Sequence, residues 1–344
     1  MHLAFCDIYA KNKPTMKRPP TPRPRIYDLY WYFASERQQV FQKRLAGKPA
    51  PWTDDPILQE YKFCNVFRAA DRVSQYMIRN VCYHRDQCSD EDRLFQIVAF
   101  RTFSKPETWD NICAFLGHQP TLDNLASGRF TDAIEHTMTL QPTIYTSAFI
   151  LCANNAYGQH RKYLNHVELF RHMFLEGELG KKLLQATSFQ EIFELLRNYP
   201  LMGNFMAYQT AIDLNYSSLI NFDENDYTVA GPGALRGMQK VFAALGDYAP
   251  AEIIHWMVEH QDEEFKRLGL KPATLFGRKL HAIDCQGLFC ETDKYCREAA
   301  PELASARKRI KAHFNETPKP ITYFFPPKWG INDKISQLFL DSVV

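Results

Sequence analysis

The chain has 344 residues, of which 45% are hydrophobic and 14% aromatic, a composition that supports a sizeable core in one large or two modest domains. Its formal net charge of +2 at pH 7 excludes recognition of nucleic acid by overall charge alone, so any such role depends on where the charges lie. No run approaches the roughly 18 consecutive apolar residues of a membrane-spanning helix, and nine cysteines without a C-x-x-C pair, with no secretion signal, predict a reduced, cytoplasmic protein.

The first segment in chain order is basic and rich in proline. Residues 11–25 contain six Lys or Arg, five Pro and no acid, a composition that cannot pack a core and stays extended. We therefore expect residues 1–25 to form a flexible basic arm. A solubilising tail and an arm that follows DNA phosphates both fit this composition.

Helical periodicity dominates the rest of the chain. From residue 26, apolar side chains recur on one helical face until Gly47 and Pro49 end the pattern. β-Alternation is limited to short stretches such as 321–325. The sequence thus predicts a mostly α fold over residues 26–320, with a weak internal boundary near 117–130 and a C-terminal tail at 321–344. The other segments with helical spacing are 55–81, 91–103, 131–156, 165–174, 189–197 and 251–268.

A tight turn separates two predicted helices. Pro200 ends the helix at 189–197, and Gly203 permits the backbone angles of a sharp hairpin before a second helix at 205–214. This arrangement resembles the helix-hairpin-helix of the DNA glycosylases, with Leu201 at the place of the first Gly in their Leu-Pro-Gly-x-Gly signature. An ordinary helix connection fits the turn as well. The backbone amides that would bind a DNA phosphate at the start of the second helix are those of Met202, Gly203 and Asn204.

An acidic run follows the second helix. Asp223 and Asp226 lie 20 and 23 residues after Gly203, close to the spacing at which the glycosylases carry an essential Asp. A carboxylate at this place could stabilise the positive charge that develops on the deoxyribose as a base is cleaved. Asp226 is the first candidate for the catalytic acid, and Asp213 and Asp223 are the alternatives.

Basic side chains near turns are candidates for phosphate binding. The turn Gly231-Pro232-Gly233 leads into a further helix with two cations beside it. An internal ion pair of Asp71 with Arg68 or Arg72 fits these residues as well as a phosphate contact does. The candidate phosphate-binding cations are Arg68, Arg72, Arg101, Lys105, Arg236 and Lys240.

Two regions offer side chains for base recognition. Gln209 and Asp213 share a helix face, so they could present an amide and a carboxylate to one base edge or form a polar surface pair. The stretch 283–297 holds a dense set of ionisable and amide groups, which would recognise a substituent on the base or form a surface network. The candidates for base recognition are Gln209, Asp284, Gln286, Glu291 and Lys294.

Several other chemistries do not fit the sequence. The H-x-E at 166–168 lacks the P-C-x-x-C of a zinc deaminase. The phosphate-binding motif G-x-x-x-x-G-K-[ST] and the dinucleotide motif G-x-G-x-x-G are absent, which argues against a kinase and a dehydrogenase. We expect no metal and no cofactor. Four residues whose gaps match neither a zinc site nor an iron–sulfur site are His281, Cys285, Cys290 and Cys296.

Six stretches together resemble one family. Their combination is similar to the alpha-glutamyl/putrescinyl thymine pyrophosphorylase-like proteins, which share a helical domain with hydroxymethyluracil DNA kinases and are distant relatives of the helix-hairpin-helix glycosylases. The resemblance implies action on a 5-hydroxymethyl pyrimidine, or on a group built upon it, in double-stranded DNA. The matching stretches are 36–58, 62–78, 100–110, 207–216, 230–237 and 283–297, and they cover most of residues 26–300.

From the turn, the acids and this resemblance we expect a DNA glycosylase-like enzyme that flips a modified pyrimidine out of the duplex and excises it, as in defence against phage DNA. The first alternative is an amino-acid or amine transferase that hypermodifies phosphorylated 5-hydroxymethyluracil in phage DNA. The second alternative is a non-catalytic reader of modified DNA. No feature of the sequence predicts an oligomeric state.

Overall fold

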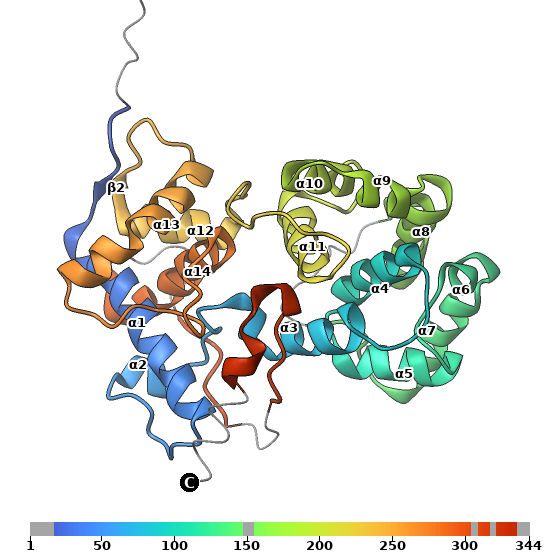
Figure 1. Ribbon diagram of the computed structural model, residues 1–344, viewed down its shortest axis with the longest axis horizontal. Coiled ribbons are helices and arrows are strands. Elements are labelled where there is room, and N and C mark those ends of the chain that lie inside the picture. The colour runs from blue at the N-terminus through green and yellow to red at the C-terminus, as the bar shows by residue number, and fades with distance from the viewer. Residues whose placement is uncertain (1–16, 147–154, 304–308, 317–320, 336–344) are drawn as a thin grey trace, which may run out of the picture.

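The computed structural model describes residues 17–146, 155–303, 309–316 and 321–335. Over these residues the fold is mostly helical, which confirms the fold class predicted from the sequence (Figure 1). The α-helices are α1 (Pro24–Leu45), α2 (Pro56–Glu60), α3 (Arg72–Met77), α4 (Asp90–Phe103), α5 (Pro106–Leu116), α6 (Leu122–Ser127), α7 (Arg129–Leu140), α8 (Lys162–Phe170), α9 (Leu179–Gln185), α10 (Phe189–Arg197), α11 (Asn204–Tyr216), α12 (Pro232–Val241), α13 (Pro250–Arg267) and α14 (Ala282–Ala299). The shorter 3-10 and π segments are η1 (Arg68–Ala70), η2 (Ile78–Cys82), η3 (Arg171–Glu176), η4 (Pro301–Leu303) and η5 (Pro327–Trp329).

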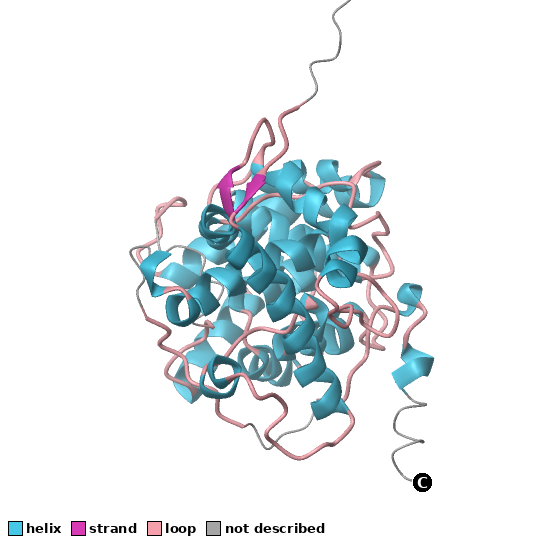
Figure 2. Ribbon diagram, turned by 90° about the vertical axis from the view of Figure 1, so that its left-hand side faces the viewer, coloured by secondary structure: helices cyan, strands magenta, loops and turns pink. Residues whose placement is uncertain are grey.

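A pair of short strands completes the described secondary structure. β1 (Thr21–Pro22) runs antiparallel to β2 (Phe242–Ala244), and Figure 2 shows how small this pair is beside the helices. Within the described ranges, no helix combines the length and the apolar character that crossing a membrane requires.

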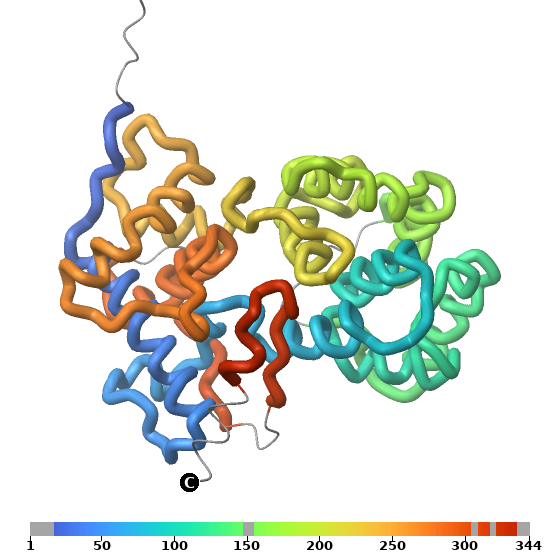
Figure 3. The backbone as a smooth tube through the Cα atoms, in the orientation of Figure 1, coloured from blue at the N-terminus to red at the C-terminus, as the bar shows by residue number. Residues whose placement is uncertain are grey.

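The helices form two groups. The first helix group contains α1, α2 and α12 to α14, and the second helix group contains α4 to α11 (Figure 1). The chain passes from the first group to the second through α3 and returns through residues 217–231, as the tube in Figure 3 shows. The two ends of the described chain therefore build one side of the molecule, and its middle builds the other.

The first helix group is organised around α14. This helix packs against α1, α12 and α13, and the hydroxyl of the buried Tyr30 donates a hydrogen bond to the carbonyl of Cys285 at 3.2 Å. A Cβ atom at Gly237 would lie 2.0 Å from the carbonyl oxygen of Phe289. The close approach of α12 to α14 therefore requires glycine at this position.

The second helix group has an aromatic centre. The ring of Phe95 on α4 lies 5.5 Å from those of Phe130 and Phe174 and 5.9 Å from that of Phe170. These edge-to-face contacts bring α4, α7, α8 and η3 together in a fully or almost fully buried cluster. These rings form the aromatic part of the second helix group within a hydrophobic core that extends through both groups.

The predicted helices match best where capping residues mark their ends. The segment 189–197 is confirmed as α10, which begins after Ser188, whose hydroxyl accepts the N–H of Glu191 at 3.1 Å. The segment 91–103 corresponds to α4, whose cap Ser89 accepts the N–H of Asp92 at 3.0 Å. Local sequence signals suffice at these places because the partners lie within one turn.

Three predicted elements differ from the structure. The helix expected at 55–81 is interrupted, because side chains take over backbone hydrogen bonds in its middle: Asp71 accepts the N–H of Asn65, and Asn65 donates to the carbonyl of Ala70, each at 2.9 Å. The strand expected at 321–325 is irregular, since the N–H groups of Phe324 and Phe325 donate to side chains rather than to a neighbouring strand. The helix expected at 131–156 ends with α7, and residues 147–154 of that prediction lie outside the described ranges.

The end of the predicted basic arm is held against the first helix group. Arg18 forms an ion pair with Asp247 at 2.7 Å, and Lys17 forms another with Glu252. β1 follows and pairs with β2, and α1 begins at Pro24 rather than after residue 25. For residues 17–25 this docking differs from the mobile arm that composition predicts, and residues 1–16 lie outside the described ranges.

Candidate functional site

The predicted hairpin joins α10 to α11, and its unusual residue is Leu201. Leu201 has a φ of +74°, in the left-handed region that favours glycine, whereas Gly203 has a φ of −67°. The position where the glycosylase signature has its first Gly thus keeps a glycine-like conformation. Met202 is buried and its N–H donates to the carbonyl of Tyr199 at 3.1 Å, so only the exposed Gly203 and Asn204 remain suited to a phosphate. Their phosphate-binding role stays a prediction.

A buried carboxylate lies on α11 beyond the hairpin. Its distance from the hairpin is roughly three helical turns, or about 15 Å along the helix axis. Asp213 is fully buried, and its Oδ1 accepts a hydrogen bond from Nη1 of Arg68 at 2.7 Å. Its Oδ2 is paired with Nε of Arg101, a buried residue of α4. The internal ion pair expected for Arg68 therefore exists, but its partner is Asp213 and not Asp71.

Arg68 is fixed by further contacts. Its Nε donates to Oε1 of Gln209 at 2.9 Å, and its Nη1 also lies 3.4 Å from the hydroxyl of Tyr216. Its Nη2 is buried and has no hydrogen-bond partner among the described residues. Gln209 and Asp213 thus share a face of α11 as predicted, and that face points to an arginine in the interior.

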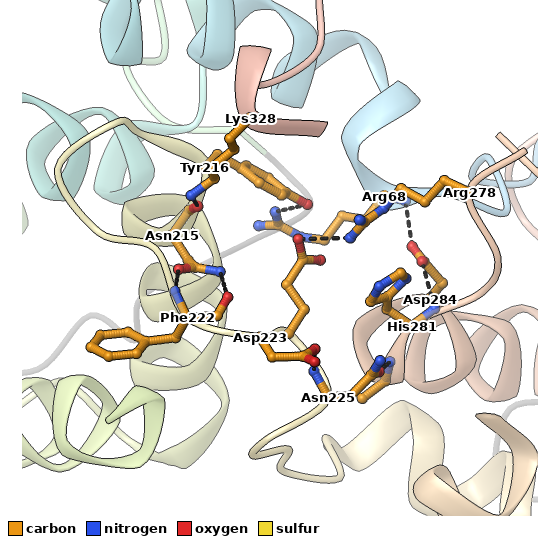
Figure 4. Close-up of polar contacts among 12 residues, drawn as sticks. Arg68, Asn215, Tyr216, Phe222, Asp223, Asn225, Arg278, His281, Asp284 and Lys328 are labelled. Carbon is orange, nitrogen blue, oxygen red and sulfur yellow. Dashed lines mark hydrogen bonds and ion pairs between the residues drawn. The ribbon is translucent and has the colours of Figure 1, made fainter. Parts of the chain in front are cut away.

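Two more buried carboxyl groups belong to this region, and one of them contacts Arg68 directly. Asp284, near the start of α14, accepts the backbone N–H of Arg68 at 3.3 Å and the backbone N–H of His281 at 3.1 Å. Glu224, from the acidic run, is buried and forms an ion pair with Arg278 at 2.8 Å. Figure 4 shows Arg68, Arg278 and Asp284 arriving from separate segments near the loop that carries Asp223 and Asn225. We refer to the following set as the junction site: Arg68, Gln209, Asp213, Tyr216, Glu224, Arg278 and Asp284.

Asp284 is the titratable group of this site with a clear consequence for stability. Burial, reinforced by the charge of Glu224, raises the pKa of its carboxyl from 3.8 to about 7. An acid whose pKa is higher in the folded chain loses folding free energy as the pH rises from its unfolded pKa to its folded pKa. The native chain should therefore lose stability from this group between roughly pH 4 and pH 7.

The variant Asp284→Asn keeps an acceptor oxygen but does not ionise. Its free energy of unfolding, measured by urea denaturation at several pH values, should rise relative to that of the unaltered chain as the pH increases from 4 to 7. Asp226→Asn, at an exposed position, is the matched control and should show no such trend. A constant difference between Asp284→Asn and the unaltered chain across this range would contradict the assignment.

The predicted catalytic acids differ in how far they are exposed. Asp223 and Asp226 are exposed, and Asp223 accepts the N–H of Asn225 at 2.8 Å within the loop. The member of the acidic run that points inward is Glu224. Asp213 is enclosed by two arginines, so it does not present a carboxylate to solvent.

The remaining candidates for base recognition divide along α14. Gln286 is buried, and its Nε2 donates to the carbonyl of Val229 at 3.3 Å, which ties α14 to the returning loop. Glu291 and Lys294 form an ion pair at 2.9 Å two turns further along the helix, and Glu291 also accepts the N–H of Cys64. Gln286 therefore lies beside the junction site, whereas Glu291 and Lys294 belong to a separate contact.

The predicted phosphate-binding cations are dispersed. Lys240 is buried against Asp293 at 3.1 Å, so its amine is not available to a phosphate, and the same holds for the guanidinium of Arg101. Arg236 is partly exposed and lies 3.5 Å from the same Asp293. Arg72 is exposed, and Lys105 lines a cavity of about 810 Å³ whose described lining shares no residue with the junction site.

Sequence reasoning missed several residues of this region. Arg278 and Lys328 carry no motif, His281 was considered only as a metal ligand, and all three lie far along the chain from Arg68. Lys328 donates to the carbonyls of Ser217 at 3.1 Å and Ile220 at 2.7 Å, and Arg278 pairs with Glu224. In the sequence, the acidic run was the feature that indicated this region. The other residues are distant from it along the chain, and folding brings them to it.

Comparison with known proteins gives a consistent family. The model described as "5-hmdU DNA kinase, helical domain" matches residues 24–305, which include every residue of the junction site. The 5-hmdU DNA kinase of Bacillus phage SP10 is 27% identical over 332 residues, covering 90% of this chain and 52% of the phage protein. The chain therefore spans about half the length of this curated relative. No solved structure matches it.

These comparisons correct one expectation from the sequence. Excision of a modified base by a glycosylase is wrong, because the matching family and relative are named for a DNA kinase and not for a base-releasing hydrolase. The expectations of hydrolysis and base flipping are wrong for the same reason, while the choice of Asp226, Asp213 and Asp223 as site acids stays a prediction. The association with hydroxymethylated bases in DNA agrees with the names of the relatives.

Proposed function

The chain belongs to the family of the 5-hmdU DNA kinase helical domain, and we propose that it is a base-modifying transferase acting on DNA that contains 5-hydroxymethyluracil. In this proposal the junction site is the reaction centre, and the acceptor is the phosphorylated form of the base, to which an amino acid or amine is joined. Phosphorylation itself is not proposed, because the chain lacks the motif G-x-x-x-x-G-K-[ST] that cradles a nucleotide phosphate.

The observation that supports this proposal most is the guanidinium of Arg68. Three of its hydrogen bonds are made to Gln209, Asp213 and Tyr216, while its buried Nη2 has no partner among the described residues. A buried donor without a partner is costly, typically about 1–3 kcal/mol. A phosphoryl or carbonyl oxygen of a bound substrate would satisfy it, and arginine is well suited to phosphate.

The neighbouring carboxyl groups suit the proton transfer of such a reaction. The amine nitrogen forms a bond to the 5-methylene carbon, the bond from that carbon to the phosphate oxygen breaks, and the phosphate leaves with the electron pair. The amine proton passes to a carboxylate. Asp284 is suited to this role because its pKa of about 7 lets it accept and release a proton near neutral pH. Glu224, held by Arg278, keeps a second negative charge close to this step.

Mass spectrometry of nucleosides tests the proposal. Duplexes carrying thymine, 5-hydroxymethyluracil or phosphorylated 5-hydroxymethyluracil are incubated with the chain and a mixture of amino acids and diamines, then digested. A heavier nucleoside is expected from the phosphorylated duplex, and only when an amine is present. Unchanged nucleoside masses in all three duplexes would refute the transferase. Selective binding of modified duplex without any change of mass would identify a non-catalytic reader instead.

A further inference from the structure

Residues 321–335 form a compact hook after the last helix of the first helix group, and in Figure 1 this segment lies between the two groups. The hook lies outside residues 24–305, which the family model matches. It is closed by Asn332, which accepts the N–H of Phe325 at 2.9 Å and donates to its carbonyl at 2.8 Å. Phe325 is fully buried. The hook is therefore a packed element of the fold.

The hook is anchored to α1 of the first helix group and to the segment that leads from this group to the second. Phe324 donates its N–H to Oε1 of Gln75 on α3 at 2.7 Å, and its ring lies 5.6 Å from that of Tyr83. The ring of Tyr323 lies 5.3 Å from that of Phe41 on α1. A segment held on both sides of the junction site fixes the spacing of the groups that form the site.

Lys328 holds the loop that follows α11. Its amine donates to the carbonyls of Asn215, Ser217 and Ile220. Carbonyls at the end of a helix lack partners within the helix and attract a cation. Partial burial of the amine lowers the pKa of Lys328 to about 8. One side chain thus satisfies three acceptors directly before the loop reaches Glu224.

Trp329 holds the other side of the same loop. Its ring lies 4.0 Å from the guanidinium carbon of Arg278, which pairs with Glu224, and 5.7 Å from the ring of Tyr216 at an angle of 84°. Such a cation–π contact stabilises a charged side chain in one orientation. Trp329 therefore contacts two members of the junction site without being matched by the family model.

We infer that the hook is part of the junction site, with Lys328 and Trp329 as positioning residues that hold the loop 217–224 and Arg278 so that Glu224 and Tyr216 keep their places around Arg68. This inference rests on the proposed function of the junction site for its effect on activity. Its effect on the loop, however, is measurable without any substrate.

The first test is hydrogen exchange of the free chain. Lys328→Met should raise the amide exchange of residues 217–224 at least several-fold, and Lys328→Arg should restore most of the protection, because it keeps the cation. Lys334→Met is the matched control: Lys334 lies on the same hook, but its amine donates to the carbonyl of Phe276. Unchanged exchange at 217–224 in Lys328→Met, or an equal change in Lys334→Met, would overturn the inference.

The second test measures the turnover of modified DNA by variants of the hook. Lys328→Met and Trp329→Leu should each lower turnover of the phosphorylated duplex about tenfold, with affinity for unmodified duplex and the midpoint of thermal unfolding nearly unchanged. Turnover equal to that of the unaltered chain would overturn the role of the hook in the site. If the unaltered chain itself shows no turnover while exchange at 217–224 rises as expected, the proposed function fails and the positioning of the loop stands.

Discussion

Replacing Asp213 by Asn is expected to lower the free energy of unfolding by about 3–5 kcal/mol, because it leaves two buried guanidinium groups without their carboxylate. Arg101 has a side chain only 2% exposed and Arg68 one 11% exposed, while Asp213 is completely enclosed. The amide of Asn preserves shape and one acceptor but removes the charge that both arginines share. Urea denaturation followed by far-ultraviolet circular dichroism measures the change.

Asp223→Asn supplies the control for this experiment. Asp223 lies in the exposed loop after α11, and its carboxylate accepts a local hydrogen bond from the N–H of Asn225. Its replacement should change the free energy of unfolding by no more than about 0.5 kcal/mol. Equal and small effects of the two substitutions would show that Asp213 is not the buried partner of Arg68 and Arg101.

The second large effect concerns Arg68. Arg68→Gln is expected to weaken selective binding of phosphorylated 5-hydroxymethyluracil duplex by a factor on the order of 10 to 100, the cost of one charge-assisted hydrogen bond. Asp213 keeps its ion pair with Arg101, so the stability loss should be smaller than for Asp213→Asn. Titration of labelled modified and unmodified duplexes, at one stated salt concentration, separates selective from general affinity.

Arg129→Gln is the matched control for Arg68→Gln. Arg129 is an exposed residue at the start of α7 in the second helix group, and it carries the same charge. Its loss should affect modified and unmodified duplexes alike, through the overall charge. If Arg68→Gln also weakened both duplexes by the same factor, the guanidinium would not be recognising the modified base, and the proposed role of the junction site would fail.

The sequence predicts the helical class well because its signals are local. Pro200 and Ser188 mark the ends of α10 from within a few residues, and the hydrophobic period reports which face is buried. The break in 55–81 was not predictable in this way. There the backbone of residues 61–67 is supported by side chains such as Asp71, and periodicity does not report such contacts.

The candidate site was predictable only in part. Gln209 and Asp213 were identified as a pair because they share one helix face, yet their partner Arg68 is 145 positions from Asp213. No spacing rule reaches that far. Arg278 and Lys328 were missed for the same reason, and the pairing of the buried Glu224 with Arg278 is not visible in the acidic run.

The resemblance predicted the family but did not determine the chemistry. A hairpin followed by an acidic loop fits a glycosylase, and it fits equally an enzyme that modifies the base while leaving it attached to the sugar. The names of the matching family and relative argue against excision, and the order of the acids along the chain does not. The structure places one acid between arginines and another where burial keeps its pKa near 7, and neither arrangement is visible in the order of the residues.

The arrangement of the two helix groups has a consequence for synthesis on the ribosome. α4 to α11 are consecutive along the chain, whereas the hydrogen bond from Tyr30 to Cys285 spans 255 positions. At typical elongation rates the ribosome needs roughly 10–50 seconds to traverse that interval. The aromatic face of α1 therefore stays exposed until α14 has been synthesised. The junction site is completed last, when α14 and the hook emerge from the ribosome.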